Sequence, residues 1–128
     1  MIGYVTLGTN DLPRAAKFYD AIAAEMGVGR MMEFDSFIAW GAPGGAPGIG
    51  LTKPFDGKAA CVGNGVMVAL EAKDREQVHR LYDIALAHGG SDEGAPGPRP
   101  HYHPHYYGAY ARDPDGNKLQ AVCHSAKG

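Results

Sequence analysis

A pattern that occurs twice along the 128 residues constrains the fold more than any other feature: a short apolar strand, an amphipathic helix, and further strand-like segments. The first copy begins with a strand over residues 2–8 and the second with a strand over residues 66–72. Tyr4 and Met67 hold equivalent places in these strands, about half the chain length apart. Repeated units of this kind bury a continuous sheet surface only by pairing. The pattern predicts an α+β fold, in which two βαβββ modules with pseudo-twofold symmetry form an open, barrel-like cavity.

Both predicted helices have recognisable ends. The first begins near Asp11 and stops at Gly27, and the second begins at Asp74 and stops at Gly89. Gln77 follows Asp74 by three residues, which is the spacing of a capping box. The apolar residues at helical spacing are Ala15, Phe18, Tyr19, Ile22 and Met26 in the first helix, and Val78, Leu81, Tyr82, Ala85 and Leu86 in the second.

Further strand-like segments complete each module. They cover residues 31–34, 37–40 and 49–53 after the first helix, and residues 106–112 and 118–123 after the second, which is followed directly by a Gly/Pro-rich link. Residues 54–64 join the two halves. We therefore predict one domain over residues 1–128, with module one at about 1–54 and module two at about 64–124.

Alternation along the strands predicts which side chains face the helices, because successive residues point to opposite faces. The apolar set expected on the helix side is Val5, Leu7, Val66, Val68 and Leu119. The opposite, mixed face then carries one unusual side chain on each of three strands: Tyr4, Met67 and Gln120.

Composition argues against several kinds of partner. Twelve basic and fourteen acidic residues give a net charge of −2 without a basic block, which disfavours binding to nucleic acid or to an anionic membrane. No apolar run approaches the roughly 18 residues of a membrane span, and no signal-peptide pattern is visible. The two cysteines, Cys61 and Cys123, lack metal-type spacing, so we expect reduced thiols in a cytoplasmic protein.

A late hairpin provides the most specific motif. Two alternating runs within residues 110–122 flank the turn Asp113-Pro114-Asp115-Gly116, in which Asp113 can bond its own downstream backbone. Together with the early strand and a helix that begins Asp-Leu-x-Arg-x-x-x-Phe-Tyr at Asp11, this turn resembles the glyoxalase/bleomycin-resistance/extradiol-dioxygenase (vicinal oxygen chelate) superfamily. The resemblance spans nearly the whole chain and implies the two-module fold described above.

The resemblance also implies where a metal would lie. In that superfamily the mixed face usually holds a divalent ion through a His on the first strand, a His or Glu on the fifth and a Glu on the last. These positions match Tyr4, Met67 and Gln120 here. A phenol, a thioether and an amide make a poor site for Zn²⁺, Ni²⁺ or Fe²⁺. We therefore expect no metal cofactor and a ligand cavity lined by these three side chains; the alternative is that they simply fill the barrel.

The segment 99–110 contains three of the six histidines and four of the seven tyrosines. In an extended chain His101 and His105 lie roughly 13 Å apart, too far to share one ion with His103 between them. A pair such as His101 with His103, or His103 with a distant carboxylate, remains open. The residues that we place at the rim of the cavity, for hydrogen bonding to and stacking on a ligand, are Arg99, His103, Tyr106 and Tyr107. Alternatively, the tyrosines pack under the loop and the histidines are solvated.

Three classes of function follow. The first is a metal-free small-molecule-binding protein of the glyoxalase/bleomycin-resistance type. The second is a metal-dependent enzyme resembling lactoylglutathione lyase or a dioxygenase, which would have to rebuild a Zn, Ni or Fe site from Gln120 and the histidines of residues 101–105, or with a partner subunit. The third is an interaction module without a ligand. The size of the chain, its sheet edges and the resemblance predict a homodimer.

Overall fold

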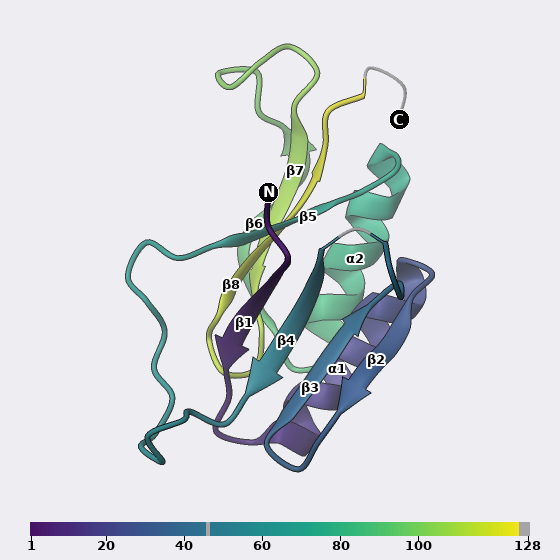
Figure 1. The fold of residues 1–128 in the computed structure, drawn as a ribbon. Coiled ribbons are helices and arrows are strands. Elements are labelled where there is room, and N and C mark those ends of the chain that lie inside the picture. Colours follow the sequence, from purple (N-terminus) through teal and green to yellow (C-terminus); the bar gives the residue numbers. More distant parts are fainter. Residues whose placement is uncertain (46, 126–128) are drawn as a thin grey trace.

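The computed structural model describes residues 1–45 and 47–125, so the last residues of the predicted domain, 126–128, lie outside the described part. Figure 1 shows two sheets, each accompanied by one helix. Module one contains β1 (Tyr4–Gly8), α1 (Leu12–Glu25), β2 (Gly29–Glu33), β3 (Phe37–Gly41) and β4 (Gly48–Thr52). Module two contains β5 (Val68–Glu71), α2 (Arg75–Ala87), β6 (Ser91–Pro98), β7 (Tyr107–Arg112) and β8 (Lys118–Cys123).

The two sheets have the same topology. Sheet A has the strand order β1-β4-β3-β2 and sheet B the order β5-β8-β7-β6. β1 runs parallel to its neighbour β4, and β5 runs parallel to its neighbour β8. Figure 1 shows that the sheets do not close into a barrel. The predicted α+β fold of two βαβββ modules is therefore confirmed.

β6 lies where the sequence suggested an irregular Gly/Pro-rich link, so that interpretation was wrong. Among the described strands β6 pairs with β7 alone, and its register shifts between Asp92 and Gly94 and again between Gly94 and Gly97. Proline cannot donate to a ladder, and it is tolerated at an edge strand or a bulge because no neighbour needs its N–H there. An edge position thus allows a strand in a segment whose composition indicates turns.

The helices end as the sequence predicts. Asp11 caps α1, and Gly27 follows that helix with a φ of 77°. At the start of α2, the backbone N–H of Gln77 donates to Asp74 Oδ1 at 2.7 Å, while the side-chain oxygen Oε1 of Gln77 accepts from the backbone N–H of Lys73 at 2.9 Å. The first contact is that of a capping box, whereas the Gln77 side chain reaches the N–H of the residue before the cap, so the pair satisfies one amide of the first turn and one just outside it.

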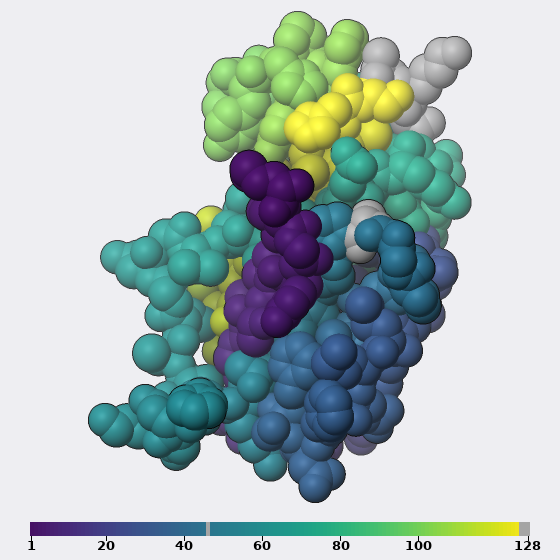
Figure 2. Space-filling view, in the orientation of Figure 1, coloured from purple at the N-terminus to yellow at the C-terminus, as the bar shows by residue number. Residues whose placement is uncertain are grey.

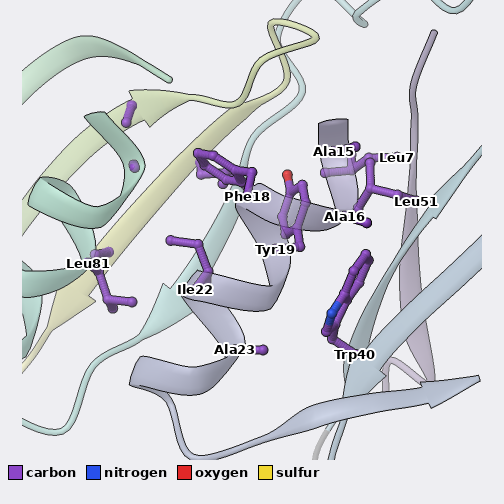
Figure 3. Packing of buried hydrophobic residues seen from close by; sticks show 14 of the residues in the cluster. Leu7, Ala15, Ala16, Phe18, Tyr19, Ile22, Ala23, Trp40, Leu51 and Leu81 are labelled. Carbon is purple, nitrogen blue, oxygen red and sulfur yellow. The ribbon is translucent and has the colours of Figure 1, made fainter. Parts of the chain in front are cut away.

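The core continues from one module to the other through α1. Figure 3 shows Tyr19 facing Trp40 of β3 and Ile22 pointing toward Leu81 of α2. The rings of Tyr19 and Trp40 lie 5.5 Å apart between centroids, and Phe18 meets Tyr19 edge-on at 4.9 Å. α1 packs on sheet A, α2 packs on sheet B, and the two helices contact each other. The modules therefore share one core.

Strand alternation holds for most of the predicted helix-facing residues. Leu7 and Leu119 are buried, and Val5 and Val68 pack against the core. Val66 is the exception, since it precedes β5 and is 51% exposed. Its N–H donates to the Gly63 carbonyl in a turn, so the chain has not yet entered the strand at this residue.

The face of sheet A opposite α1 is open to solvent. Tyr4 on this face is 65% exposed and pairs with Gly48, which leaves a shallow surface beside the phenol. The large apolar side chains exposed in this module include Ile2, Met31, Met32 and Phe34. A homodimer that covers them stays a prediction. Neither helix in residues 1–45 and 47–125 combines the length and the apolarity needed to cross a membrane.

The Asp-Pro-Asp-Gly turn joins the two modules as well as reversing the chain. Asp113 is 3% exposed, and its Oδ1 accepts from the backbone N–H groups of Asp115 and Asn117, each at 2.9 Å. Its Oδ2 accepts from the Tyr19 hydroxyl on α1 at 2.7 Å and from Asn117 Nδ2 at 2.9 Å. Asn117 Nδ2 also donates to the Gly8 carbonyl at the end of β1. The turn thus binds both the helix and the first strand of module one.

Two tyrosines make the folded state sensitive to alkali. Burial, followed by the charge and the hydrogen bond of Asp113, raises the pKa of Tyr19 well above its ordinary value. Burial, followed by the neighbouring Tyr106, raises the pKa of Tyr110 to about 12. An unfolded tyrosine ionises near pH 10, so above about pH 9 the unfolded chain binds fewer protons than the folded one.

The contribution of these tyrosines to stability should consequently be constant up to about pH 9 and should fall as the pH rises toward 12. Urea unfolding followed by circular dichroism at several pH values measures the slope. Tyr19→Phe should make the slope shallower, whereas Tyr4→Phe, which removes an exposed phenol, should leave it unchanged. An equal slope in wild type and Tyr19→Phe would contradict the assignment to Tyr19.

Candidate functional site

A pocket of about 470 Å³ lies on the face of sheet B away from α2. Residues from three places in the chain form it: the approach to β5, the strands β6 to β8, and the loop that leads into β7. The lining residues are Met67, Glu93, Arg99, His101, Tyr102, Tyr106, Tyr110 and Lys118. Because Tyr110 pairs with Gln120 across β7 and β8, both side chains lie on this face of the sheet.

A buried amide lies directly behind the pocket. Gln120 is 2% exposed, and its Nε2 donates to the hydroxyl oxygens of Tyr106 at 2.5 Å and Tyr110 at 3.1 Å. Gly108 lies beside it on β7, where an added Cβ would be 3.1 Å from Gln120 Nε2. The missing side chain at Gly108 therefore leaves room for the amide between the two phenols.

Aromatic rings form one wall. The centroids of His101 and Tyr102 lie 4.2 Å apart, and those of Tyr102 and Tyr106 lie 4.8 Å apart. Tyr106 also meets His103 at 5.2 Å, and His103 Nε2 lies 2.9 Å from His124 Nδ1. Tyr102 is 59% exposed, so the row of rings begins at the buried amide and ends in solvent. Such a wall suits stacking on a planar molecule.

Two cations flank Tyr110. The Arg99 guanidinium carbon lies 5.6 Å and Lys118 Nζ lies 5.5 Å from the centre of its ring. The guanidinium donates to the carbonyls of Ala95 at 2.9 Å and Pro98 at 3.2 Å, which hold it in place without cancelling its charge. Within the described residues Lys118 forms no hydrogen bond or ion pair through its ammonium.

The structure brings together only some of the residues predicted for the site. Met67, Arg99 and Tyr106 line the pocket, and Gln120 lies directly behind it. Tyr4 lies on sheet A and does not line the pocket.

His103 and Tyr107 also lie outside the lining. His103 packs behind Tyr106 against His124. Tyr107 points toward α2, where its hydroxyl lies 2.6 Å from His79 Nε2 and its ring lies 4.9 Å from the Arg75 guanidinium carbon.

Sequence reasoning missed Tyr110 and Lys118, although strand alternation would have found both. Residues at even positions of β7 and β8 share the face of Gln120, so Tyr110 and Lys118 belong with it. The same alternation sends Tyr107 to the helix side. The missed signal for Tyr110 was therefore the register of β7, since alternation had been applied only to the strands of Tyr4, Met67 and Gln120.

The residues at the superfamily's usual metal positions do not fit a metal ion. Tyr4 offers a phenol, Met67 offers a thioether, and the Gln120 amide nitrogen is engaged with two phenols. Across the described ranges 1–45 and 47–125, no group of three or more His, Cys, Asp and Glu side chains could hold a metal ion. Catalytic metal sites commonly use three such ligands. No chemical step is therefore derived through a metal.

A second hollow, of about 560 Å³, lies where the end of α1 meets β5 and the start of α2. Its polar groups bind one another. Glu25 accepts from Arg80 at 3.0 Å and from Gln77 Nε2 at 3.1 Å, and this reduces the pKa of the Glu25 carboxyl. These contacts hold the helices of the two modules together, so we place the functional site in the aromatic pocket instead.

Comparison with known proteins agrees with this fold. The sequence profile of the Glyoxalase/Bleomycin resistance protein/Dioxygenase superfamily matches residues 1–121. The chain is similar to the crystal structure of a glyoxalase/bleomycin resistance protein from Albidiferax ferrireducens T118, with 36% identity and a TM-score of 0.87 over 96% of this chain and 98% of that one. No curated protein matches the chain.

More distant structures share the fold alone. One is a glyoxalase-related enzyme from Fulvimarina pelagi, with 21% identity and a TM-score of 0.73 over 94% of this chain and 86% of that chain. Another is lactoylglutathione lyase from Agrobacterium tumefaciens, with 20% identity and a TM-score of 0.67 over 96% of this chain and 92% of that chain.

Proposed function

This chain belongs to the glyoxalase/bleomycin resistance protein/dioxygenase superfamily, and from that premise we propose that it is a metal-free small-molecule-binding protein. One observation carries the proposal: the pocket on sheet B, where aromatic and cationic side chains converge without a set of metal ligands. Its volume of about 470 Å³ falls within the range of about 300–1,000 Å³ usual for small-molecule sites.

The kind of ligand follows from the wall of the pocket. Tyr102 and Tyr106 offer ring faces, and Met67 adds an adaptable apolar surface. A flat ring system can stack on this wall, while the phenols that the buried amide holds in place bind its polar end. A planar organic molecule with one polar end therefore fits better than a flexible aliphatic one.

The alternative from the sequence is a metal-dependent lyase- or dioxygenase-like enzyme with a rearranged site. Such chemistry needs an ion that polarises oxygen atoms of the substrate or activates dioxygen. His103 Nε2 and His124 Nδ1 lie 2.9 Å apart behind the aromatic wall, but no third ligand joins them among the described residues. The donor set therefore favours the metal-free function.

We expect protein purified without a histidine tag to carry far less than one Zn, Ni or Fe per chain in elemental analysis. A planar aromatic probe, 2-naphthoate, should bind equally well with and without EDTA in a fluorescence titration. Tyr102→Ala should weaken this binding about five-fold, because it removes part of the stacking wall.

The matched control is Tyr4→Ala, which removes an exposed phenol from the other sheet and should not change the affinity. Stoichiometric metal whose removal abolishes probe binding would establish the metal-dependent alternative. Equal affinities in wild type and Tyr102→Ala would move the ligand away from this pocket.

A further inference from the structure

We infer that this pocket selects ligands that carry an oxyanion, as an aromatic carboxylate, phenolate or enolate does, through two cations and a cluster of phenol O–H groups that Gln120 orients. The inference rests on the proposed small-molecule function and specifies the chemical class of its ligand. Neither Tyr110 nor Lys118, on which it depends, is among the site residues expected from the sequence or from the superfamily resemblance.

Gln120 determines which way the hydrogen bonds of the phenols run. An amide nitrogen carries two hydrogens, and Gln120 Nε2 directs them at the hydroxyl oxygens of Tyr106 and Tyr110. A phenol has one O–H donor and also accepts through its oxygen. Because each oxygen here accepts from the amide, each O–H points away from Gln120. The Tyr110 hydroxyl also shares hydrogen bonds with those of Tyr106 and Tyr102, so the three phenols form one linked cluster whose last O–H can donate to a ligand. Gln120 thereby fixes the direction of donation in this cluster.

A phenol donates a hydrogen bond only while it keeps its proton. Burial, followed by the charge and hydrogen bond of Tyr106, raises the pKa of Tyr110 to about 12. Tyr110 therefore remains a donor at any physiological pH, and it adds no negative charge that would repel an anion.

Arg99 and Lys118 both line the pocket beside Tyr110, and neither forms an ion pair with a carboxylate of the described residues. Glu93 is the one acid among the described lining residues, and its Oε1 accepts from Arg112 Nε at 2.7 Å. The pocket lining thus holds two cations without an ion pair and one carboxylate that is already paired. Cations lining a concave site favour an anion over a neutral group of the same shape.

The phenols and the two cations define one end of the ligand, and the aromatic wall defines the other. Tyr102 and His101 extend the row of rings away from the phenol pair toward solvent. An anion conjugated to a flat ring would place its oxygens between the phenols and the cations, and its ring against the wall. A neutral alcohol on the same ring keeps the stacking but loses the attraction of the cations.

The test compares 2-naphthoate with 2-naphthalenemethanol, which share a ring system and differ in charge. Titrations near neutral pH and at low salt should show naphthoate binding at least about ten-fold more tightly. Lys118→Met should reduce this preference several-fold and affect the alcohol little. Tyr110→Phe should weaken naphthoate about five-fold, because one donor is lost.

Gln120→Glu is the most informative substitution, since it keeps the shape but leaves only acceptors when ionised. The phenol protons would then turn inward to the new carboxylate, whose charge repels an anion. We expect naphthoate to bind at least about ten-fold more weakly and the alcohol to change by less than about three-fold. Should this variant fail the circular-dichroism check of folding, Tyr110→Phe combined with Lys118→Met gives the same comparison.

The outcomes separate the two proposals. Equal affinity of the wild type for both probes, or unchanged naphthoate affinity in folded Gln120→Glu, would overturn the oxyanion inference and leave the binding function standing. Failure of both probes to bind at this pocket would instead overturn the proposed function.

Discussion

Replacing Asp113 with alanine should lower the free energy of unfolding by about 3–5 kcal/mol. Asp113 is 3% exposed and accepts four hydrogen bonds, from two backbone amides of its own turn, from Asn117 Nδ2 and from Tyr19 on α1. Alanine would leave the buried Tyr19 hydroxyl without its acceptor, and a buried unsatisfied group costs about 1–3 kcal/mol. Urea unfolding monitored by circular dichroism measures the change.

The matched control is Asp35→Ala, an exposed acid with no hydrogen bond or ion pair among the described residues. This substitution should change stability by less than about 0.5 kcal/mol. Asp113→Asn should fall between the two, because it keeps one acceptor oxygen and replaces the other with a donor. A loss below about 1 kcal/mol in Asp113→Ala would show that the turn does not hold the modules together.

Truncating Trp40 to alanine should cost about 3–5 kcal/mol, which is usual for removing a large ring from a core. Trp40 is 2% exposed and packs on Tyr19, as Figure 3 shows. Its indole N–H donates to Asp20 Oδ1 at 2.8 Å, and Asp20 also accepts from Arg30. These interactions reduce the pKa of Asp20, with the Arg30 bond as the largest cause. The substitution would open a cavity and remove one of the donors to this carboxylate.

Two further variants test whether the loss of stability comes from the buried ring of Trp40. Trp40→Phe keeps most of the ring and should cost clearly less than Trp40→Ala, with the lost N–H bond as a main cause. Phe34→Ala removes a ring that is 62% exposed next to β3, so it should change stability by less than about 0.5 kcal/mol. If Trp40→Ala and Phe34→Ala cost the same, the core of module one does not depend on Trp40.

The Trp40 variant also separates stability from binding. Trp40 belongs to sheet A and the pocket lies on sheet B, so the folded fraction of Trp40→Ala should bind 2-naphthoate with wild-type affinity.

Figure 2 shows that the segment joining the two modules, residues 54–64 in teal, projects from the body of the molecule. Phe55 in this segment is fully exposed, so it belongs to neither the core nor the pocket.

Local chemistry made much of the fold predictable from the sequence. The capping contacts of Asp74 and Gln77 and the turn at Asp113 form between residues only two to four positions apart. Interactions at such short range depend on the order of residues alone, so a pattern can reveal them. Strand alternation likewise places Leu7 and Leu119 in the core, because its period follows from backbone geometry.

The site could be predicted only in part, because long-range packing assembles it. Met67, Arg99 and Tyr106 were expected at the cavity and do line one pocket, but Tyr4 lies on the other sheet. Tyr107 was expected at the rim, yet it contacts His79 of α2. The register of β7 decides between the two faces, and a shift of one residue would exchange them.

Tertiary structure alone decided how the modules meet and what Gln120 does. The Tyr19–Asp113 hydrogen bond joins residues 94 positions apart, and no local pattern marks such a pair. β6 is a strand despite its glycines and prolines, because β7 offers it a partner at the edge of the sheet. Gln120 is identified by sequence as an unusual residue on a mixed face. Only the packing of β7 against β8 places its amide between two phenols, because the spacing between side chains depends on how strands pair.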